Sequence, residues 1–311
     1  MATYTDDQIT RYLTHIDNPI TSAEAARLAV QSDPLPFLTT LQHHHMARVP
    51  FESLSLHYSP HRTLSLDPSD LFDKIVHRGR GGYCMEVNCF FGTVLRSLGY
   101  TLYSAGGRVL LGGVVSGWNH MLNILTISNQ KYAIDVGFGS QGPVSPLPLI
   151  SSPGSPAEFE TIAPAQGRLE YRPLSVHTDP AQKVWVYSWR RSPDEPWGEM
   201  YAFVETEFFP ADFDVMNLKT MTAPTSFFVQ NVMCLRIVLD EGTRAPTGAI
   251  ILHRDFVKIR ISGQPETVTT LKTEKERIEA LEQHFGIVLT EKEQKAIAGL
   301  ASEIRGATGH A

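Results

Sequence analysis

The fold is decided by one stretch, Arg78-Gly79-Arg80-Gly81-Gly82-Tyr83-Cys84-Met85-Glu86-Val87-Asn88, whose glycine-bearing turns lead a cysteine into an apolar helix. Gly81-Gly82 permits backbone angles that are closed to other residues. Beyond Cys84, apolar residues recur at helical spacing until Gly99 ends the pattern. The sequence therefore predicts that Cys84 lies in the first turn of a helix.

This predicted position suits a nucleophile. Unpaired backbone N–H groups and the positive end of the helix dipole lie in a first helical turn, Arg80 is close in sequence, and both favour a thiolate at Cys84. The common alternative, a buried cysteine that packs like a small hydrophobe, fits Cys89 well. For Cys84 the Gly-Gly approach and the polar partners found downstream favour the nucleophile.

Composition limits the class of protein. A chain of 311 residues predicts two or three subdomains packed together, and 42% hydrophobic with 19% charged residues is an ordinary globular composition. A formal net charge of −6 gives no basic patch for nucleic acid. Three cysteines make no disulfide framework and suit a reducing compartment, and no stretch approaches the roughly 18 apolar residues of a membrane span. We expect a cytoplasmic protein without membrane partners.

The segments before and beyond the quoted stretch carry helical signals. Residues 6–48 predict three short helices, opened by acidic, Thr/Ser or Pro residues, and residues 68–76 predict a fourth. His43-His44-His45 falls on the third of these helices. Because neighbouring side chains on a helix point about 100° apart, these rings favour a partly exposed polar face rather than a metal site.

After Gly99 the period of the pattern changes from 3.6 to 2. Residues 100–111, 119–128 and 131–138 predict antiparallel strands, with a short polar turn between the last two. His120 and Asp135 lie on these neighbouring strands, about equally far from the turn. A carboxylate within an apolar strand is expensive to bury unless a partner neutralises it, so we expect Asp135 to pair with His120.

The rest of the chain predicts a second set of strands and helices. Residues 142–167 are rich in Pro, Ser and Gly and predict a long surface excursion. Strands at 168–177, 184–191 and 199–205 would close the first sheet into a barrel-like unit, with Gly106-Gly107 and Gly112-Gly113 as bulges. Residues 212–228 predict a helix with a turn at Pro224, and strands at 232–239, 249–254 and 256–261 precede helices at 273–285 and 290–305.

Cys84, His120 and Asp135 supply a nucleophile, a base and a residue that orients the base. The chain also carries, in order, Val49-Pro50-Phe51-Glu52, Arg80-Gly81-Gly82-Tyr83-Cys84, Asp135-Val136-Gly137-Phe138-Gly139 and Met216-Asn217 followed by Thr222-Ala223-Pro224-Thr225-Ser226. Together these motifs resemble the arylamine N-acetyltransferases over residues 35–234. The resemblance implies an α+β fold with an N-terminal helical bundle (1–99), a central antiparallel β-barrel (100–208) and a C-terminal α/β lid (209–311). It also implies a triad like that of cysteine proteases and transglutaminases.

The function that the resemblance implies is acyl transfer by a ping-pong mechanism through an acyl-cysteine, as in xenobiotic metabolism. An acyl-CoA would be the co-substrate, with no permanently bound cofactor and no metal, and the acceptor would be an arylamine, hydrazine or arylhydroxylamine. Two features depart from the usual pattern: the excursion after residue 142, and Ser53 where the family usually has Asn. Length and excursion are similar to fungal members, so acetyl, propionyl and malonyl all stay open as the acyl group. The pattern carries no signal for an oligomeric state.

Further candidate site residues are less specific. Phe51 and Phe138 flank the motifs and suit the walls of an acceptor pocket, although plain core packing explains them equally. The remaining candidates match family positions near the coenzyme or suit a buried ion pair that shapes the site, and they are Gly117, Thr222 and Ser226 for the first role and Arg80 with Glu52 for the second.

Two other functions use the same residues. The first is a thiol hydrolase or transglutaminase-like enzyme, but intervals of 36 and 15 residues between Cys84, His120 and Asp135 exclude the papain pattern, in which the partners follow the cysteine by roughly 130–150 residues. The second is a catalytically idle scaffold of the same fold. Such a scaffold would tolerate the loss of a triad member, and this chain has all three.

Overall fold

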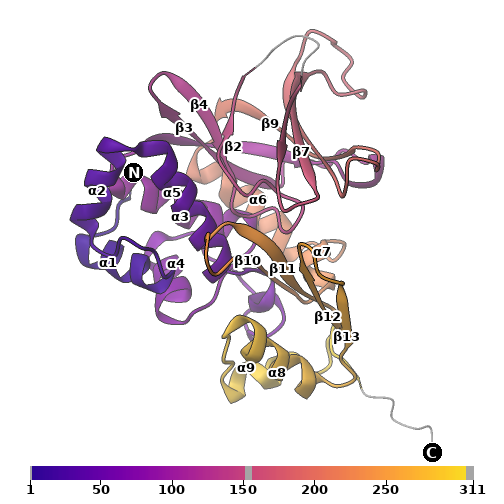
Figure 1. Cartoon of the computed structure of the whole chain (residues 1–311). Helices are drawn as coiled ribbons and strands as arrows, with labels where there is room; N and C mark the ends of the chain where they lie inside the picture. The colour runs from indigo at the N-terminus through magenta and orange to yellow at the C-terminus, as the bar shows by residue number, and fades with distance from the viewer. Residues whose placement is uncertain (1, 151–155, 306–311) are drawn as a thin grey trace, which may run out of the picture.

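The computed structural model describes residues 2–150 and 156–305, and it has a mixed α+β fold. Helices from the first third of the chain pack beside an eight-stranded sheet, and a five-stranded sheet with the last two helices lies on the other side of them (Figure 1). The predicted α+β class is confirmed. In the described part of the chain, no helix is long and apolar enough to cross a membrane.

The N-terminal helices form where the sequence provides caps. Their bounds are α1 (Asp6–His15), α2 (Ala23–Ser32), α3 (Pro34–Arg48), α4 (Pro68–Phe72), which continues into a π-helical turn (Asp73–His77), and α5 (Cys84–Leu98). Thr5, Ser22 and Asp67 each accept a hydrogen bond from the first turn of the helix that follows. Gly99 ends α5 in the left-handed region with φ 101°. These helices match the predicted ones.

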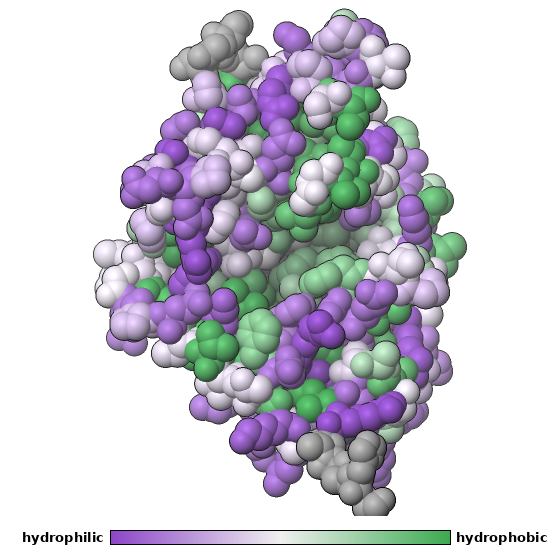
Figure 2. Space-filling view, turned by 90° about the vertical axis from the view of Figure 1, so that its right-hand side faces the viewer, coloured by the Kyte–Doolittle hydropathy of each residue, from purple (hydrophilic) through white to green (hydrophobic). Residues whose placement is uncertain are grey.

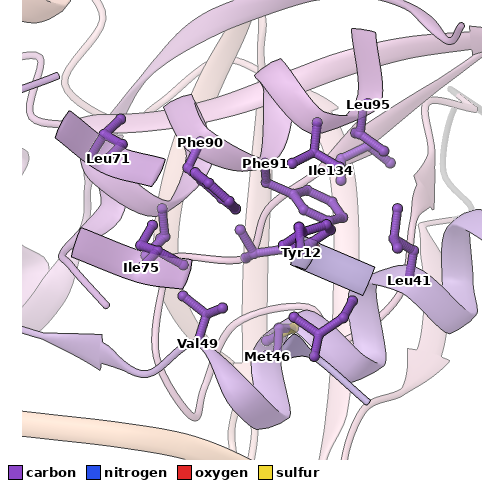
Figure 3. Close-up of a cluster of buried hydrophobic side chains, with 14 of the residues drawn as sticks. Tyr12, Leu41, Met46, Val49, Leu71, Ile75, Phe90, Phe91, Leu95 and Ile134 are labelled. Atoms are coloured by element: carbon purple, nitrogen blue, oxygen red, sulfur yellow. The ribbon is translucent and has the colours of Figure 1, made fainter. Parts of the chain in front are cut away.

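The core between these helices is built around α5. Its apolar face buries Phe90, Phe91 and Leu95 against side chains of the other helices. Figure 3 shows the cluster, in which the labelled side chains of α1, α3, α4, the π-helical turn, α5 and β4 point toward one another. The helix that begins at Cys84 is therefore held from several sides, which fixes the position of its first residue.

The sequence predicted that the three consecutive histidines form a partly exposed polar face. That prediction is wrong. His44 and His45 are buried and only His43 is intermediate. The Nδ1 of His45 lies 3.0 Å from the Tyr12 hydroxyl, and the Nδ1 of His44 lies 3.2 Å from the Ile16 carbonyl oxygen. Burial lowers the pKa of His45 to about 3, so this ring is a neutral part of the core.

The larger sheet is open rather than a closed barrel. Its order is β5-β4-β3-β2-β9-β8-β7-β6. Its strands are β2 (Thr101–Val109), β3 (His120–Ile127), β4 (Gln130–Ile134), β5 (Leu147–Pro148), β6 (Ala157–Glu160), β7 (Gln166–Arg172), β8 (Val184–Arg190) and β9 (Gly198–Glu207). All pairs are antiparallel, and the register shifts between Ala105 and Gly107, where a bulge was predicted. Gly112-Gly113 instead forms a short 3₁₀ turn (Leu111–Gly113). The predicted excursion contains β5 and β6, and its residues 151–155 lie outside the described residues.

The smaller sheet joins one short strand from the first third of the chain to four strands from its last third. Its order is β1-β10-β11-β12-β13, with β1 (Phe51–Glu52), β10 (Met233–Leu239), β11 (Pro246–His253), β12 (Phe256–Ile261) and β13 (Thr267–Thr270). The sequence predicted neither β1 nor β13. Four helices complete this part of the molecule: α6 (Pro210–Thr222), α7 (Phe227–Gln230), α8 (Glu274–Phe285) and α9 (Glu291–Ala296). The helix predicted at 290–305 is wrong beyond Ala296, because Gly299 adopts φ 82° there.

The stretch before Cys84 is clamped against β1. Gly82 pairs with Phe51, and hydrogen bonds join the Gly82 N–H to the Pro50 carbonyl (3.2 Å) and the Glu52 N–H to the Gly82 carbonyl (3.0 Å). The preceding Gly81 lies so close to Pro50 that a Cβ there would stand 1.7 Å from the Pro50 carbonyl oxygen. A side chain at Gly81 would therefore push the nucleophile turn away from β1.

We predict that Gly81→Ala lowers the free energy of unfolding by about 3 kcal/mol, because a backbone carbonyl cannot rotate away as a side chain can. Gly242→Ala is the matched control, since its new Cβ would meet nothing closer than the Asp240 Oδ1 at 3.6 Å. Urea unfolding of both variants measures the effect. Equal stabilities of the two variants would contradict the close contact between Gly81 and Pro50.

Candidate active site

The structure places Cys84 where the sequence predicts it, as the first residue of α5. The Tyr83 N–H donates to the Glu86 carboxylate (3.2 Å), which caps the helix start. Cys84 is 3% exposed, and its Sγ donates toward the Asn119 carbonyl oxygen at 3.6 Å. The thiol thus faces the segment that leads into β3.

His120 begins β3 and Asp135 follows the last residue of β4. The ladder between these strands, which pairs Asn123 with Ile134, brings both side chains to the same end of the sheet. The Nε2 of His120 lies 2.7 Å from the Asp135 Oδ2, and both residues are buried. The structure therefore contains the expected His120–Asp135 pair, and Nδ1 is the ring nitrogen left for the thiol.

Electrostatics keep this pair ionised. Burial alone would lower the pKa of His120, but the Asp135 carboxylate and then the neighbouring Cys84 outweigh burial and raise it to about 10. Burial likewise opposes the charge of Asp135, yet His120, the Asn88 amide and the Gly137 N–H hold the pKa of this carboxyl below its usual value. At neutral pH the pair is therefore an imidazolium and a carboxylate.

Asn88 is a site residue that the sequence reading missed. Its Nδ2 donates to the Asp135 Oδ1 (3.0 Å) and to the Met121 carbonyl (2.8 Å), and its Oδ1 accepts from the Val136 N–H (3.1 Å). The available signal was a polar residue one helical turn after Cys84 on an otherwise apolar face. Asn88 thus ties the helix of the nucleophile to both strands.

Gly137 explains how the strand end approaches that helix so closely. A Cβ at this position would lie 2.8 Å from the Cys84 Cα and 2.9 Å from the Asn88 Nδ2. Its N–H also donates to the Asp135 Oδ1 (2.8 Å). Glycine is therefore required here for contact between Asp135 and the start of α5.

A network of buried charges lies behind the nucleophile turn. The Arg80 Nη2 lies 3.3 Å from the Glu52 Oε1, so the two residues expected to pair are neighbours. Lys74, which was not predicted, lies 2.6 Å from the Glu86 carboxylate and 3.7 Å from that of Glu52. Burial and the nearby Glu52 raise the pKa of Glu86 and Lys74 opposes them. The network links the π-helical turn, β1 and α5. It therefore helps to fix the turn that precedes Cys84.

A cavity of about 650 Å³ opens beside Cys84 and His120. Its walls are mainly apolar, and Figure 2 shows a hollow on one face of the molecule bordered mainly by apolar residues. Four aromatic residues contribute: Phe51 and Phe138, as predicted, and Phe227 and Phe228. The Phe51 and Phe228 rings meet edge to face at 5.9 Å.

Of the three residues that were predicted to lie near the coenzyme, two line the cavity. Gly117 and Ser226 line the cavity, whereas Thr222 does not and bonds instead to the Leu218 carbonyl at the end of α6. Gln141 and Lys219 line it without having been predicted. Among residues 2–150 and 156–305, no three His, Cys, Asp or Glu side chains are grouped to hold a metal ion.

Comparisons with known proteins agree with this geometry. The model of a protein family described as N-acetyltransferase matches residues 34–294. An N-malonyltransferase, FDB2, of Fusarium pseudograminearum is 41% identical over 285 residues, covering 85% of this chain and 81% of the relative. A chicken arylamine N-acetyltransferase, the pineal gland isozyme NAT-3, is 30% identical over 76% of this chain and 86% of its own length. The solved arylamine N-acetyltransferase of Mycobacterium marinum in complex with CoA superposes with a TM-score of 0.74 at 25% identity, covering 93% of this chain and 97% of that one.

We predict that brief iodoacetamide treatment near neutral pH labels Cys84 first, since only Cys84 stands at a helix start beside a histidine. Burial raises the pKa of Cys89 to about 11 and raises that of Cys234 well above its usual value. Peptide mapping identifies the modified thiol, with Cys84→Ala as the control that should stay unlabelled. Earlier labelling of Cys89 or Cys234 would contradict the prediction.

The ion pair also predicts a pH dependence of stability. Between pH 6.5 and 10 the folded state keeps a proton on His120 that the unfolded chain has lost, so the stabilisation is complete below pH 6.5 and disappears as pH rises toward 10. In Asp135→Asn the carboxylate that contributes most to the raised pKa of His120 is absent, so burial favours the neutral ring and the pKa is expected to fall. The difference in unfolding free energy between wild type and this variant should shrink with rising pH, by up to about 1.4 kcal/mol per pH unit. Urea unfolding across this range measures it, and a constant or growing difference would disprove the charged pair.

Proposed function

This chain belongs to the arylamine N-acetyltransferase family, and on that premise we propose that it moves a short acyl group from an acyl-CoA to an arylamine, hydrazine or arylhydroxylamine through an acyl-Cys84 intermediate. The observation that carries the proposal is His120, which hydrogen-bonds Asp135 and lies beside Cys84 at the wall of a mainly apolar cavity. Acyl transfer from acyl-CoA is the activity of the family. The roles of the three triad residues, the identity of the acyl group and the identity of the acceptor are what we propose beyond that activity.

In the first half-reaction the Cys84 thiolate attacks the thioester carbonyl of the donor. A bond forms between the carbonyl carbon and Sγ, and the bond from that carbon to the coenzyme sulfur breaks. The departing sulfur takes the proton from the His120 imidazolium, so free coenzyme A leaves as a thiol. The enzyme then holds a thioester on Cys84 and a neutral His120.

In the second half-reaction the amine nitrogen attacks the carbonyl of the acyl-Cys84. An amide bond forms as the bond from carbon to Sγ breaks, and the nitrogen loses one proton to His120. Cys84 returns as a thiolate and His120 as an imidazolium. Asp135 keeps the ring oriented and compensates its positive charge in both halves.

The shape of the cavity supports an aromatic acceptor. Flat arylamines bind well between aromatic walls, and Phe51, Phe138 and Phe228 provide such walls around Cys84. Apolar walls also keep water from the thioester, which separates a transferase from a thiol hydrolase. We therefore favour amine transfer over hydrolysis at this site.

The names of two relatives point to two different acyl groups for the donor. The fungal relative named for malonyl transfer is 41% identical to this chain, whereas the chicken relative named for acetyl transfer is 30% identical. Malonyl-CoA is therefore included beside acetyl-CoA and propionyl-CoA as a proposed donor. An arylamine remains the proposed acceptor for each of them.

We predict that the acyl-enzyme accumulates when the protein meets an acyl-CoA without an amine, because the mainly apolar walls of the cavity disfavour water beside the thioester. Intact mass spectrometry should show one added acyl group, mapped to the Cys84 peptide, together with a burst of about one equivalent of free coenzyme A. An arylamine added afterwards should discharge the adduct. Steady release of coenzyme A without an amine would identify a hydrolase, and the absence of any adduct would support the idle scaffold.

A further inference from the structure

The catalytic cavity contains an unexpected charge. Apart from the reacting Cys84 and His120, Lys219 is the one charged residue among the described residues that line it. No Asp or Glu of the described chain lies within ion-pair distance of its ammonium group, although most Lys and Arg side chains around the molecule have such a partner. Lys219 is exposed to solvent, so the mainly apolar cavity is lined by a solvent-accessible cation that no carboxylate of the described chain neutralises.

The position of Lys219 relates it to the reacting groups. It lies on α6, and its Nζ would stand 3.7 Å from a Cβ at Gly117, which belongs to the segment that enters β3. Two residues after Gly117, the Asn119 carbonyl contacts the Cys84 Sγ, and His120 follows directly. The ammonium group therefore lies against the same short segment that borders the nucleophile.

Apolar walls increase the effect of this charge. An ammonium group beside low-dielectric walls attracts an anion more strongly than one on an open surface. A lysine also has a flexible four-carbon stem, so its head can follow a ligand group within the cavity. The cavity is therefore suited to a substrate that carries a negative charge near its reacting carbonyl.

We propose that Lys219 is a specificity-determining residue that binds the free carboxylate of a dicarboxylic acyl group, a donor of the malonyl-CoA type, while Cys84 attacks the thioester carbonyl. The inference rests on the proposed function above. In malonyl the two carbonyl carbons are separated by one methylene, so the carboxylate enters the same cavity as the reacting carbon. The carboxylate stays ionised and intact throughout, since the only bonds that change are those at the thioester carbon.

The other anionic part of an acyl-CoA is its phosphate groups. They carry several charges, and proteins bind such groups with several donors or with Arg and Lys together. The described lining of the cavity supplies one lysine and no arginine. A single ammonium matches a single carboxylate better, and an experiment separates these two sources of negative charge.

The experiment compares malonyl-CoA with butyryl-CoA, which differ in charge but not in chain length, and adds acetyl-CoA as a shorter neutral donor. For wild type, Lys219→Met and Lys219→Arg, kcat/KM is measured with malonyl-CoA, butyryl-CoA and acetyl-CoA, with an uncharged arylamine such as 4-methylaniline in excess. Butyryl is the neutral match for malonyl. Lys275→Met on α8 removes an exposed lysine outside the cavity and is the control for loss of a positive charge.

We expect Lys219→Met to lower the ratio of kcat/KM for malonyl-CoA to that for butyryl-CoA by at least about tenfold, mainly through KM, as loss of one charged hydrogen bond implies. Lys219→Arg should keep the ratio within about threefold because it retains the charge. Lys275→Met should match wild type with every donor.

An equal loss with all three donors would show that Lys219 binds the phosphates common to them, and the inference would be wrong. An unchanged ratio in Lys219→Met, or a wild type that uses acetyl-CoA and butyryl-CoA but not malonyl-CoA, would also overturn it. The proposed function fails separately, and is recognised by a wild type that forms no adduct on Cys84 with any donor.

Discussion

The buried contact between His120 and Asp135 is the interaction on which the rest of the structure depends. A carboxylate removed from water costs several kcal/mol unless the protein replaces its hydration. Here both carboxylate oxygens and the backbone carbonyl of Asp135 have partners: Oδ2 has His120, Oδ1 has Asn88 and Gly137, and the carbonyl accepts from the Gln42 amide at 3.2 Å. The carboxylate partners come from β3, α5 and the end of β4, and α3 contacts the carbonyl of the same residue, so this one position ties four elements together.

How far the sequence predicted this site depends on the range of each signal. Cys84 was predictable because a glycine pair and a helical pattern are local, and His120 and Asp135 because a hairpin places its two strands in register. Lys74 was not, since a lysine in a short helical turn is usually solvated and only the fold places it between Glu52 and Glu86. Likewise β1 is only two residues long. It forms because Phe51 pairs with β10, a strand that is distant in sequence.

The same limit explains the errors in the fold. A strand pattern predicts that residues pair, but closure of a barrel depends on where the outermost strands end, and β5 and β6 remain the two edges of this sheet. The cavity shows the limit most clearly. Its walls join Phe51, Phe138 and Phe228, which are far apart in sequence. Lys219 is exposed to solvent and reaches the cavity because its ammonium group lies beside Gly117. No short-range pattern carries that information.

In the proposed mechanism, the proton affinity of His120 changes during the catalytic cycle. The raised pKa of His120 reflects the Asp135 carboxylate and, in the proposed mechanism, the negative charge of the Cys84 thiolate, which together outweigh burial. Once Cys84 carries an acyl group, that charge is gone, so only Asp135 continues to favour the imidazolium against burial. The proton is then held less tightly at the moment when the departing coenzyme sulfur needs it, and the neutral ring that remains is the base required by the incoming amine. Restoring the thiolate restores the contribution of Cys84, so each half-reaction prepares His120 for the next.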